Sequence, residues 1–219
     1  MNNQKNTHIP SFLQGVGGNY IITIGRQLGS GGKQIGELLS QKLGIPCYDK
    51  ELIHLASRES GLGKEFFEKA DEKSSFSLFG SYFGFRSGYM GGGSGNYLTN
   101  ENLFQIQSEV IKELAGKESC IFVGRCADYI LRNHPHRLSV FISANLDDRE
   151  RRIRTSRNIN EKEALILIEQ TDKKRSGYYN YYTNKTWGMA TSYDLCVNSS
   201  VFGIEKSIEM IEEYVKTHF

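Results

Sequence analysis

The sequence predicts an α/β domain of three layers, in which a parallel sheet lies between helices on both faces. Short β-branched apolar segments, typical of buried strands, alternate along the chain with segments whose apolar residues recur at helical spacing. This alternation favours a parallel sheet covered on both faces. The length of 219 residues suits one such domain with an insertion and a lid.

The first strand is predicted over residues 20–24, which are apolar and largely β-branched. A helix follows, because Ile35, Leu38, Leu39 and Leu43 recur at helical spacing, and Gly44 is placed to end it. Residues 45–48 then predict a brief extended segment closed by Asp49, and helical spacing resumes over residues 50–60.

The second half of the chain repeats this alternation. Strands are predicted over residues 120–123, 138–142 and 195–197, and helices over residues 102–114, 161–175 and 204–215. Right-handed crossovers place the carboxyl ends of all these strands at one edge of the sheet. We therefore expect the glycine-rich turn after the first strand, Asp49, Arg125 and residues 147–157 to meet at that edge, where open α/β sheets bind ligands.

Composition divides the chain into a loose polar arm over residues 1–18 and a domain over residues 19–219. Within the domain, residues 74–97 alternate glycine and serine with aromatic side chains, and residues of about 147–187 form an arginine-rich lid region. The aromatic segment is either a mobile surface excursion or a flap whose rings stack on a base. The sequence leaves both interpretations open.

The overall charge and the cysteines restrict the classes of function. A net charge of +2 gives no electrostatic case for nucleic-acid or membrane binding. The four cysteines are scattered and form no C-x-x-C pair, so we expect reduced thiols in a cytoplasmic protein and no metal site. The first residues lack the apolar core of a signal peptide, and no segment reaches membrane-spanning length.

The turn after the first strand contains four glycines within eight residues: Gly25, Gly29, Gly31 and Gly32. Glycine lets backbone N–H groups surround phosphate oxygens, and the amino terminus of the following helix adds positive charge. Lys33 is placed to reach the terminal phosphates of a nucleotide. The predicted phosphate-binding residues are Gly29, Ser30, Gly31, Gly32, Lys33 and Gln34.

The match to the common phosphate loop G-x-x-x-x-G-K-[ST] is incomplete. With Gly32 and Lys33 on its G-K pair, Gln27 stands in place of the first glycine and Gln34 in place of the magnesium-binding hydroxyl. A loop one residue longer, starting at Gly25, restores the glycine but not the hydroxyl. A phosphate turn over residues 29–31 would instead leave Ser30 as the nearest hydroxyl.

Arginines and aspartates provide the other candidates. Arg125 ends a buried strand and offers a bidentate fork for phosphate, or pairs with a carboxylate. The run over residues 149–157 holds five arginines that cannot all face one ligand, and we favour Arg157 with either Arg149 or Arg152.

Two further groups remain ambiguous at the level of sequence. Asp172 and Arg175 either form a salt bridge on one helical face or contribute to substrate and phosphate binding. Asp49 caps the next helix, orients the acceptor, or holds magnesium through water.

With these residues assembled, the chain resembles the cytidylate kinase-like family, a branch of the P-loop nucleoside monophosphate kinases. The segments that carry the resemblance are ITIGRQLGSGGKQIGELL, IPCYDKELI, IFVGRCADYIL, VFISA with the arginine run, TDKKRSGYY and YDLCVNSS. The resemblance implies a P-loop kinase fold and transfer of a phosphoryl group from ATP, with Mg2+, to a nucleoside monophosphate, CMP or dCMP being the first guess.

The resemblance also implies roles for individual residues. Residues 29–33 would grip the donor phosphates, Arg125 would meet the acceptor phosphate, and Arg157 and Arg175 would act from the lid, so these arginines and Lys33 are the predicted catalytic residues. The predicted substrate contacts are Asp49, Arg125, Asp128 and Asp172. Asp128 is included because cytidylate kinases carry the sequence G-R-D where this chain has Gly124, Arg125 and Cys126. The acidic substrate contact is then missing or moved to Asp128.

Gln34 and Cys126 motivate an alternative function, a regulatory protein that keeps the kinase fold and binds nucleotides without catalysis. A kinase for another small metabolite is the third possibility, with the aromatic segment setting specificity. In each case small-molecule nucleotides are the expected partners, and the sequence does not indicate an oligomeric state.

Overall fold

The structure is a computed structural model, which describes residues 18–49, 53 and 100–219. The polar arm, the glycine-rich aromatic segment and, apart from residue 53, the helix expected over residues 50–60 lie outside the described residues. Contacts divide the chain into one unit of residues 1–50 and 111–219 and a second unit of residues 51–110. The sheet lies in the first unit.

The sheet has five parallel strands in the order β2-β3-β1-β4-β5. These are β1 (Ile21–Arg26), β2 (Cys47–Tyr48), β3 (Cys120–Val123), β4 (Arg137–Ser143) and β5 (Leu195–Asn198). In register, Ile22 of β1 pairs with Ile121 of β3 on one side and with Leu138 of β4 on the other. Each strand predicted from the sequence is present, and the parallel α/β fold is confirmed.

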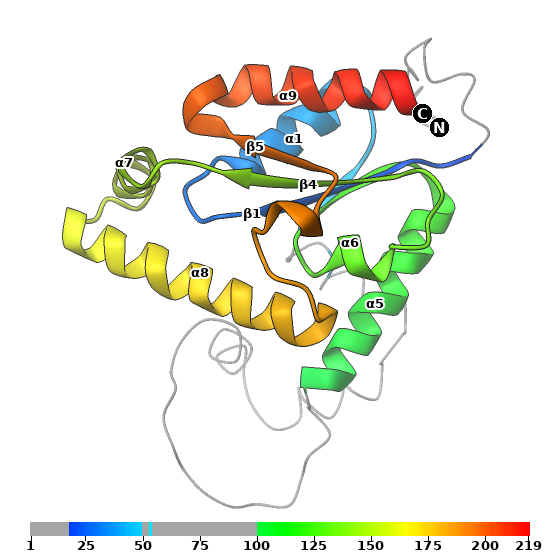
Figure 1. Cartoon of the computed structure of the whole chain (residues 1–219), viewed down its shortest axis with the longest axis horizontal. Helices are drawn as coiled ribbons and strands as arrows, with labels where there is room; N and C mark the ends of the chain where they lie inside the picture. The colour runs from blue at the N-terminus through cyan, green and yellow to red at the C-terminus, as the bar shows by residue number, and fades with distance from the viewer. Residues whose placement is uncertain (1–17, 50–52, 54–99) are drawn as a thin grey trace, which may run out of the picture. The chain divides into compact units, whose positions relative to one another are not determined.

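Helices cover both faces of this sheet (Figure 1). On one face α1 (Gly32–Leu43) and α9 (Ser199–His218) pack against each other, and on the other lie α6 (Ala127–Ile130) and α8 (Glu161–Thr183). Helix α7 (Leu146–Arg157) follows the carboxyl end of β4 and packs on α8, while α5 (Asn100–Lys117) leads into β3 and η2 (Ala190–Ser192) precedes β5. The helix predicted over residues 161–175 continues to Thr183, so the tyrosines that follow Gly177 are helical.

The main core lies between the sheet and the face formed by α1 and α9. Ile22, Ile24, Ile35 and Leu39 are completely or almost completely buried there, as the apolar spacing of β1 and α1 predicts. Removing such side chains from water stabilises the fold by roughly 1.5–3 kcal/mol each. The core therefore fixes α1 against the strand that precedes it, and with it the loop that joins them.

The strand order places this loop at a favourable point. β1 lies in the middle of the sheet, and the chain continues first to β2 and β3 on one side and only later to β4 and β5 on the other. Open α/β sheets bind ligands outside the carboxyl ends of the strands where the order reverses in this way. The loop after β1 occupies that position.

No helix in the described part of the chain combines the length and the apolar character needed to cross a bilayer.

Gly36 permits the close approach of α1 to the sheet. A Cβ atom at this position would lie 3.0 Å from Cγ2 of Val123 and 3.4 Å from both Sγ of Cys47 and Cδ1 of Ile24. We expect Gly36→Val to lower the free energy of unfolding by about 1–3 kcal/mol, because added atoms overpack this contact.

Chemical denaturation monitored by circular dichroism measures this loss. The matched control is Gly177→Val, since a Cβ at this helical position of α8 meets no atom within 4 Å. The control should change stability by less than about 0.5 kcal/mol. Equal stability of the two variants would contradict the close packing of α1.

Candidate active site

The loop between β1 and α1, residues 27–31, here called the glycine loop, requires glycine at two positions. Gly29 and Gly31 have φ angles of 78° and 80°, in the left-handed region that side chains disfavour. A Cβ at Gly29 would lie 2.7 Å from the carbonyl oxygen of Arg149, and a Cβ at Gly31 would overlap Cδ1 of Ile204. These glycines therefore let α7 and α9 approach the loop closely.

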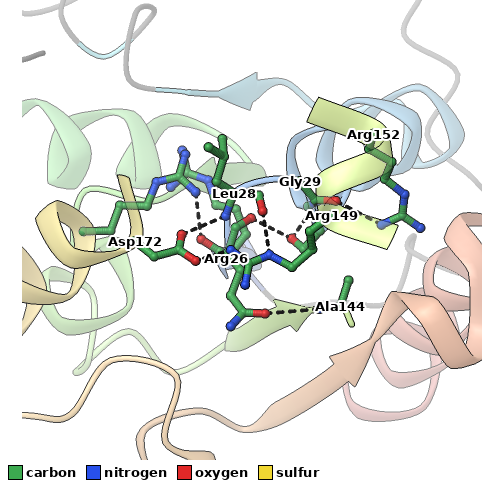
Figure 2. A network of polar contacts seen from close by, with 11 residues as sticks. Arg26, Leu28, Gly29, Ala144, Arg149, Arg152 and Asp172 are labelled. Atoms are coloured by element: carbon green, nitrogen blue, oxygen red, sulfur yellow. Dashed lines mark hydrogen bonds and ion pairs between the residues drawn. The ribbon is translucent and has the colours of Figure 1, made fainter. Parts of the chain in front are cut away.

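Side chains from the second half of the chain hold the carbonyl oxygens of the glycine loop (Figure 2). Arg149 Nε donates to the Leu28 oxygen at 2.7 Å, and Arg152 Nη1 donates to the Gly29 oxygen at 3.0 Å. Ser199 Oγ donates to the Ser30 oxygen at 2.6 Å. Three successive carbonyl groups are thus fixed toward α7 and α9.

This arrangement determines where the amides point. In a planar trans peptide the N–H group lies opposite the C=O group, and the chain contains no cis peptide bond among its described residues. The N–H groups of Gly29 and Gly31 consequently face away from the side chains that hold the preceding oxygens. In the described part of the chain they donate to no other residue, so they are available to an anion.

Asp172 of α8 completes the support of the loop. Its Oδ1 accepts the N–H of Leu28 at 2.8 Å, and its Oδ2 forms an ion pair with Arg149, which is almost fully buried. The salt bridge considered from the sequence, between Asp172 and Arg175, is replaced by this one. Both carboxylate oxygens serve the loop, and a direct contact of Asp172 with a substrate stays a prediction.

The five arginines of α7 divide between the loop and the surface, as their helical spacing indicates. Arg149 and Arg152 bind the glycine loop, whereas Arg151 and Arg154 pair with Asp148 and Glu150 at the surface. Arg157 lies exposed in the last turn of α7. The structure therefore does not bring Arg157 together with the other predicted catalytic residues.

Lys33 lies in the first turn of α1, directly after the glycine loop, and meets Asp49 from the end of β2. Its Nζ is 2.7 Å from Oδ2 of Asp49 and 3.8 Å from Oε1 of Glu37. About half of the lysine side chain remains exposed to solvent. Asp49 and the loop thus meet at one edge of the sheet, as the topology predicts.

The hydroxyl and amide side chains beside Lys33 take different positions. Ser30 is completely buried, and its Oγ donates to the Gln27 oxygen at 2.9 Å, so this hydroxyl closes the turn. Gln34 is exposed in the first turn of α1. Gln27 Oε1 accepts the N–H of Ala144 at 3.2 Å and ties the loop to the end of β4.

Arg125 follows β3 in an unusual turn. Gly124, Arg125 and Cys126 all have positive φ angles, of 86°, 60° and 56°. For residues other than glycine this conformation is unfavourable and persists only where the surrounding structure imposes it. The guanidinium lies 5.6 Å from the centre of the Tyr178 ring, and burial lowers the pKa of Arg125.

Arg26, the last residue of β1, is a candidate that the sequence interpretation missed. A Cβ at Gly124 would overlap its Nη1 atom, so the guanidinium lies against the turn that carries Arg125. Burial, with the nearby charges of Arg175 and Arg125, lowers the pKa of Arg26 to about 9. The sequence did contain a signal that could have identified Arg26. It is an arginine at the end of the strand that leads into a glycine-rich turn.

Arg175 of α8 lies in the same region. Its Nη1 donates to the carbonyl oxygen of Arg26 at 3.0 Å, and burial lowers its pKa. Three cations, Arg26, Arg125 and Arg175, are therefore gathered at the carboxyl edge of the sheet beside the glycine loop. Close like charges favour the binding of an anion among them.

Asp128 is placed away from this cluster. It is buried on α6 and accepts a hydrogen bond of 2.7 Å from the hydroxyl of Tyr179 on α8. Burial raises the pKa of this carboxyl. Its carboxylate is thus engaged between two helices, and its contact with a substrate stays a prediction.

These groups together suit a ligand with several phosphates. The amides of Gly29 and Gly31, the helix terminus and Lys33 form one side of the site, and the arginine cluster forms another. Such groups stabilise the negative charge of phosphoryl oxygens. Asp49, which pairs with Lys33, is one carboxylate near the loop that could hold a divalent cation through water.

The comparisons with known proteins agree with this geometry. The sequence matches the family model described as "Cytidylate kinase-like family" over residues 21–201. An uncharacterized protein from Eubacterium ventriosum, of known crystal structure, is 26% identical with a TM-score of 0.69, and the alignment covers 91% of this chain and 100% of that one. No curated protein matches the chain.

Two shikimate kinases share the fold at lower identity. The enzyme from Bacteroides thetaiotaomicron is 15% identical with a TM-score of 0.52, and the alignment covers 90% of this chain and 98% of that one. The enzyme from Acinetobacter baumannii, in complex with shikimate, is 12% identical with a TM-score of 0.51, covering 92% and 94%. The fold is therefore that of the P-loop kinases.

The ion pair between Arg149 and Asp172 gives a prediction about stability. Arg149→Met should lower the free energy of unfolding by about 3 kcal/mol, because it leaves the carboxylate of Asp172 half-buried and unpaired. Asp172→Asn should also destabilise the protein. The double variant should lose about 1–3 kcal/mol less than the sum of the two single losses.

Urea denaturation of the four proteins measures this cycle. Arg151→Met is the matched control, since its pair with Asp148 lies at the surface, and it should change stability by less than about 1 kcal/mol. Additive losses at positions 149 and 172 would show that the two residues support the loop independently.

Proposed function

Because the chain belongs to the cytidylate kinase-like family, we propose that it transfers a phosphoryl group from ATP to a nucleoside monophosphate, with CMP or dCMP as the first acceptor to test. One observation carries the proposal. The glycine loop, with its outward-facing amides, and the arginine cluster lie at the same edge of the sheet. A donor and an acceptor phosphate can therefore be held side by side.

The donor side consists of the glycine loop and Lys33. The amides of Gly29 and Gly31 would bind oxygens of the donor phosphates, and Lys33 would exchange part of its interaction with Asp49 for a terminal phosphate. Since about half of the Lys33 side chain is exposed, it can turn toward a ligand. ATP with Mg2+ supplies the phosphoryl group and a neutralising charge when bound.

The acceptor side consists of Arg125 and Arg175. Arg125 presents its guanidinium from a turn whose three consecutive left-handed residues fix its direction. Arg175 comes from α8 and is oriented by its hydrogen bond to the Arg26 oxygen. Their charges would hold the acceptor phosphate so that one of its oxygens faces the donor.

The chain's contribution to the reaction is position and charge. Phosphoryl transfer needs little covalent chemistry from the protein, so no side chain of this chain has to attack or accept the phosphoryl group. The arginines and Lys33 would counter the negative charge on the phosphoryl oxygens during transfer. Asp172 and Arg149 would act through the loop, by holding its amides in the binding orientation.

A second candidate function is a regulatory protein that binds ATP without turning it over. The observation that favours it is Gln34, whose exposed amide replaces the hydroxyl that usually holds magnesium in such loops. The burial of Asp128 also removes one side chain from base recognition in this conformation, which widens the range of acceptors to examine.

A coupled assay for ADP formation separates these functions. With ATP and Mg2+, we expect turnover of at least one monophosphate from a panel of CMP, dCMP, UMP, AMP and GMP, and loss of turnover in excess EDTA. Lys33→Met should lower kcat by roughly 100-fold or more, because one charge that stabilises the transferring group is lost.

The control for Lys33 is Lys206→Met, which alters a surface lysine on α9 and should leave kcat unchanged. ATP binding measured by calorimetry, with no ADP formed from any monophosphate, would support the regulatory protein instead. Turnover of a different hydroxyl or phosphate acceptor, found by adding metabolites to the same assay, would retain the kinase and replace the nucleotide.

A further inference from the structure

The side chain of Arg26 differs from the other arginines beside the glycine loop. Arg149, Arg152 and Arg175 each donate to a backbone carbonyl oxygen at this site. The Arg26 guanidinium, with five N–H donors, forms no hydrogen bond and no ion pair with another residue in the described part of the chain. A partly buried cation without such a partner is unfavourable unless a ligand supplies one.

Two glycines far apart in the sequence make room for this side chain. A Cβ at Gly32, the first residue of α1, would lie 2.5 Å from Cβ and 3.0 Å from Cγ of Arg26. A Cβ at Gly124 would overlap Nη1 and lie 3.1 Å from Cζ. The stem of Arg26 therefore passes the end of the glycine loop, and its guanidinium reaches the turn that carries Arg125.

Arg26 consequently lies between the two halves of the proposed site. Gly32, which lies between the glycine loop and Lys33, is close to its stem, and the turn that carries Arg125 is close to its head. The nearest carboxylates are already engaged, Asp49 with Lys33 and Asp172 with Arg149 and Leu28. The positive potential around Arg26 thus remains for a bound anion.

We propose that the Arg26 guanidinium contacts the phosphoryl group as it passes from donor to acceptor, an inference that rests on the proposed kinase function. An oxygen of the deprotonated acceptor phosphate forms a bond to the γ-phosphorus of ATP. The bond from this phosphorus to the bridging oxygen breaks, and that oxygen keeps the electron pair as ADP leaves. Arg26 gives up no proton and stabilises the charge on the transferring oxygens.

The loop gives a reason for this additional cation. In the common phosphate loop, the residue after the lysine carries the hydroxyl that binds magnesium. In this chain Gln34 follows Lys33, so this side-chain ligand for magnesium is missing. A guanidinium between the two phosphates would supply positive charge beside the transferring group. Arg26 therefore determines the rate of transfer more than the affinity for the donor.

The test compares Arg26→Met and Arg26→Lys with the wild-type protein in the ADP assay. We expect Arg26→Met to lower kcat by roughly 100- to 1000-fold, with a change in KM for ATP of less than about tenfold. Arg26→Lys should recover part of kcat, because it keeps the charge but not the planar fork. A matched control is Arg132→Met, which removes an exposed arginine beside Tyr129 of α6 and should leave kcat unchanged.

The outcomes decide the proposal. A kcat of Arg26→Met equal to that of Arg132→Met would overturn it, and so would a loss confined to KM for ATP. Thermal unfolding of each variant identifies a loss of structure. If Arg26→Met does not fold, Arg26→Lys is judged alone, and a kcat equal to the wild-type value in that variant overturns the proposal.

A binding measurement separates this proposal from the kinase function itself. In calorimetry with Mg2+, the wild-type protein should bind ATP more tightly than ADP, and Arg26→Lys or Arg26→Met should reduce that ratio by about tenfold, as one charged contact to the γ-phosphate is lost. This result would support the contact even if no acceptor were turned over. An unchanged ratio, or no binding of either nucleotide to the wild-type protein, would overturn it.

Discussion

The proposed site depends on how the peptide planes of the glycine loop are held. Left alone, a chain of glycines and small residues samples many conformations, and ordering each residue costs about 1–2 kcal/mol. Here Arg149, Arg152 and Ser199 fix three successive carbonyl oxygens; the two bonds from arginine contribute about 1.5–3 kcal/mol each and the bond from the Ser199 hydroxyl about 1 kcal/mol. The same contacts direct the amides to the opposite side, so one set of interactions both stabilises the loop and forms the anion site.

These contacts change the interpretation of the arginine-rich region. Arginines near a phosphate loop are readily interpreted as phosphate ligands, yet Arg149 and Arg152 each donate to a backbone carbonyl oxygen of the glycine loop. Movement of the first half of α7 would break these contacts and release the loop. A closing motion over a substrate is therefore more compatible with the exposed carboxyl end of α7, where Arg157 lies, than with the part that contacts the loop.

The sequence predicts the features that depend on local patterns. Apolar periodicity identifies the buried strands, and the glycines between β1 and α1 mark the loop, because both signals lie within a few residues. The pairing of Arg149 with Asp172 depends on how two helices cross, whereas helical spacing within one segment offered only Arg175 as a partner, as one of two alternatives. Arg26 was missed for a similar reason, since the space for its side chain is created by Gly124, almost a hundred residues away.

The distribution of charge at this edge indicates what kind of ligand it can hold. The carboxylates of Asp49 and Asp172 are each engaged with a cation, and Asp128 is withdrawn into the contact between α6 and α8. Arg175 and Arg125 lie close enough to Arg26 to act on its charge, and burial, together with repulsion from these two arginines, lowers the pKa of Arg26. A neutral acceptor would leave that repulsion in place, whereas a phosphate monoester beside the donor phosphates would relieve it. Relief of this repulsion would thus add to the binding energy of a pair of polyanions.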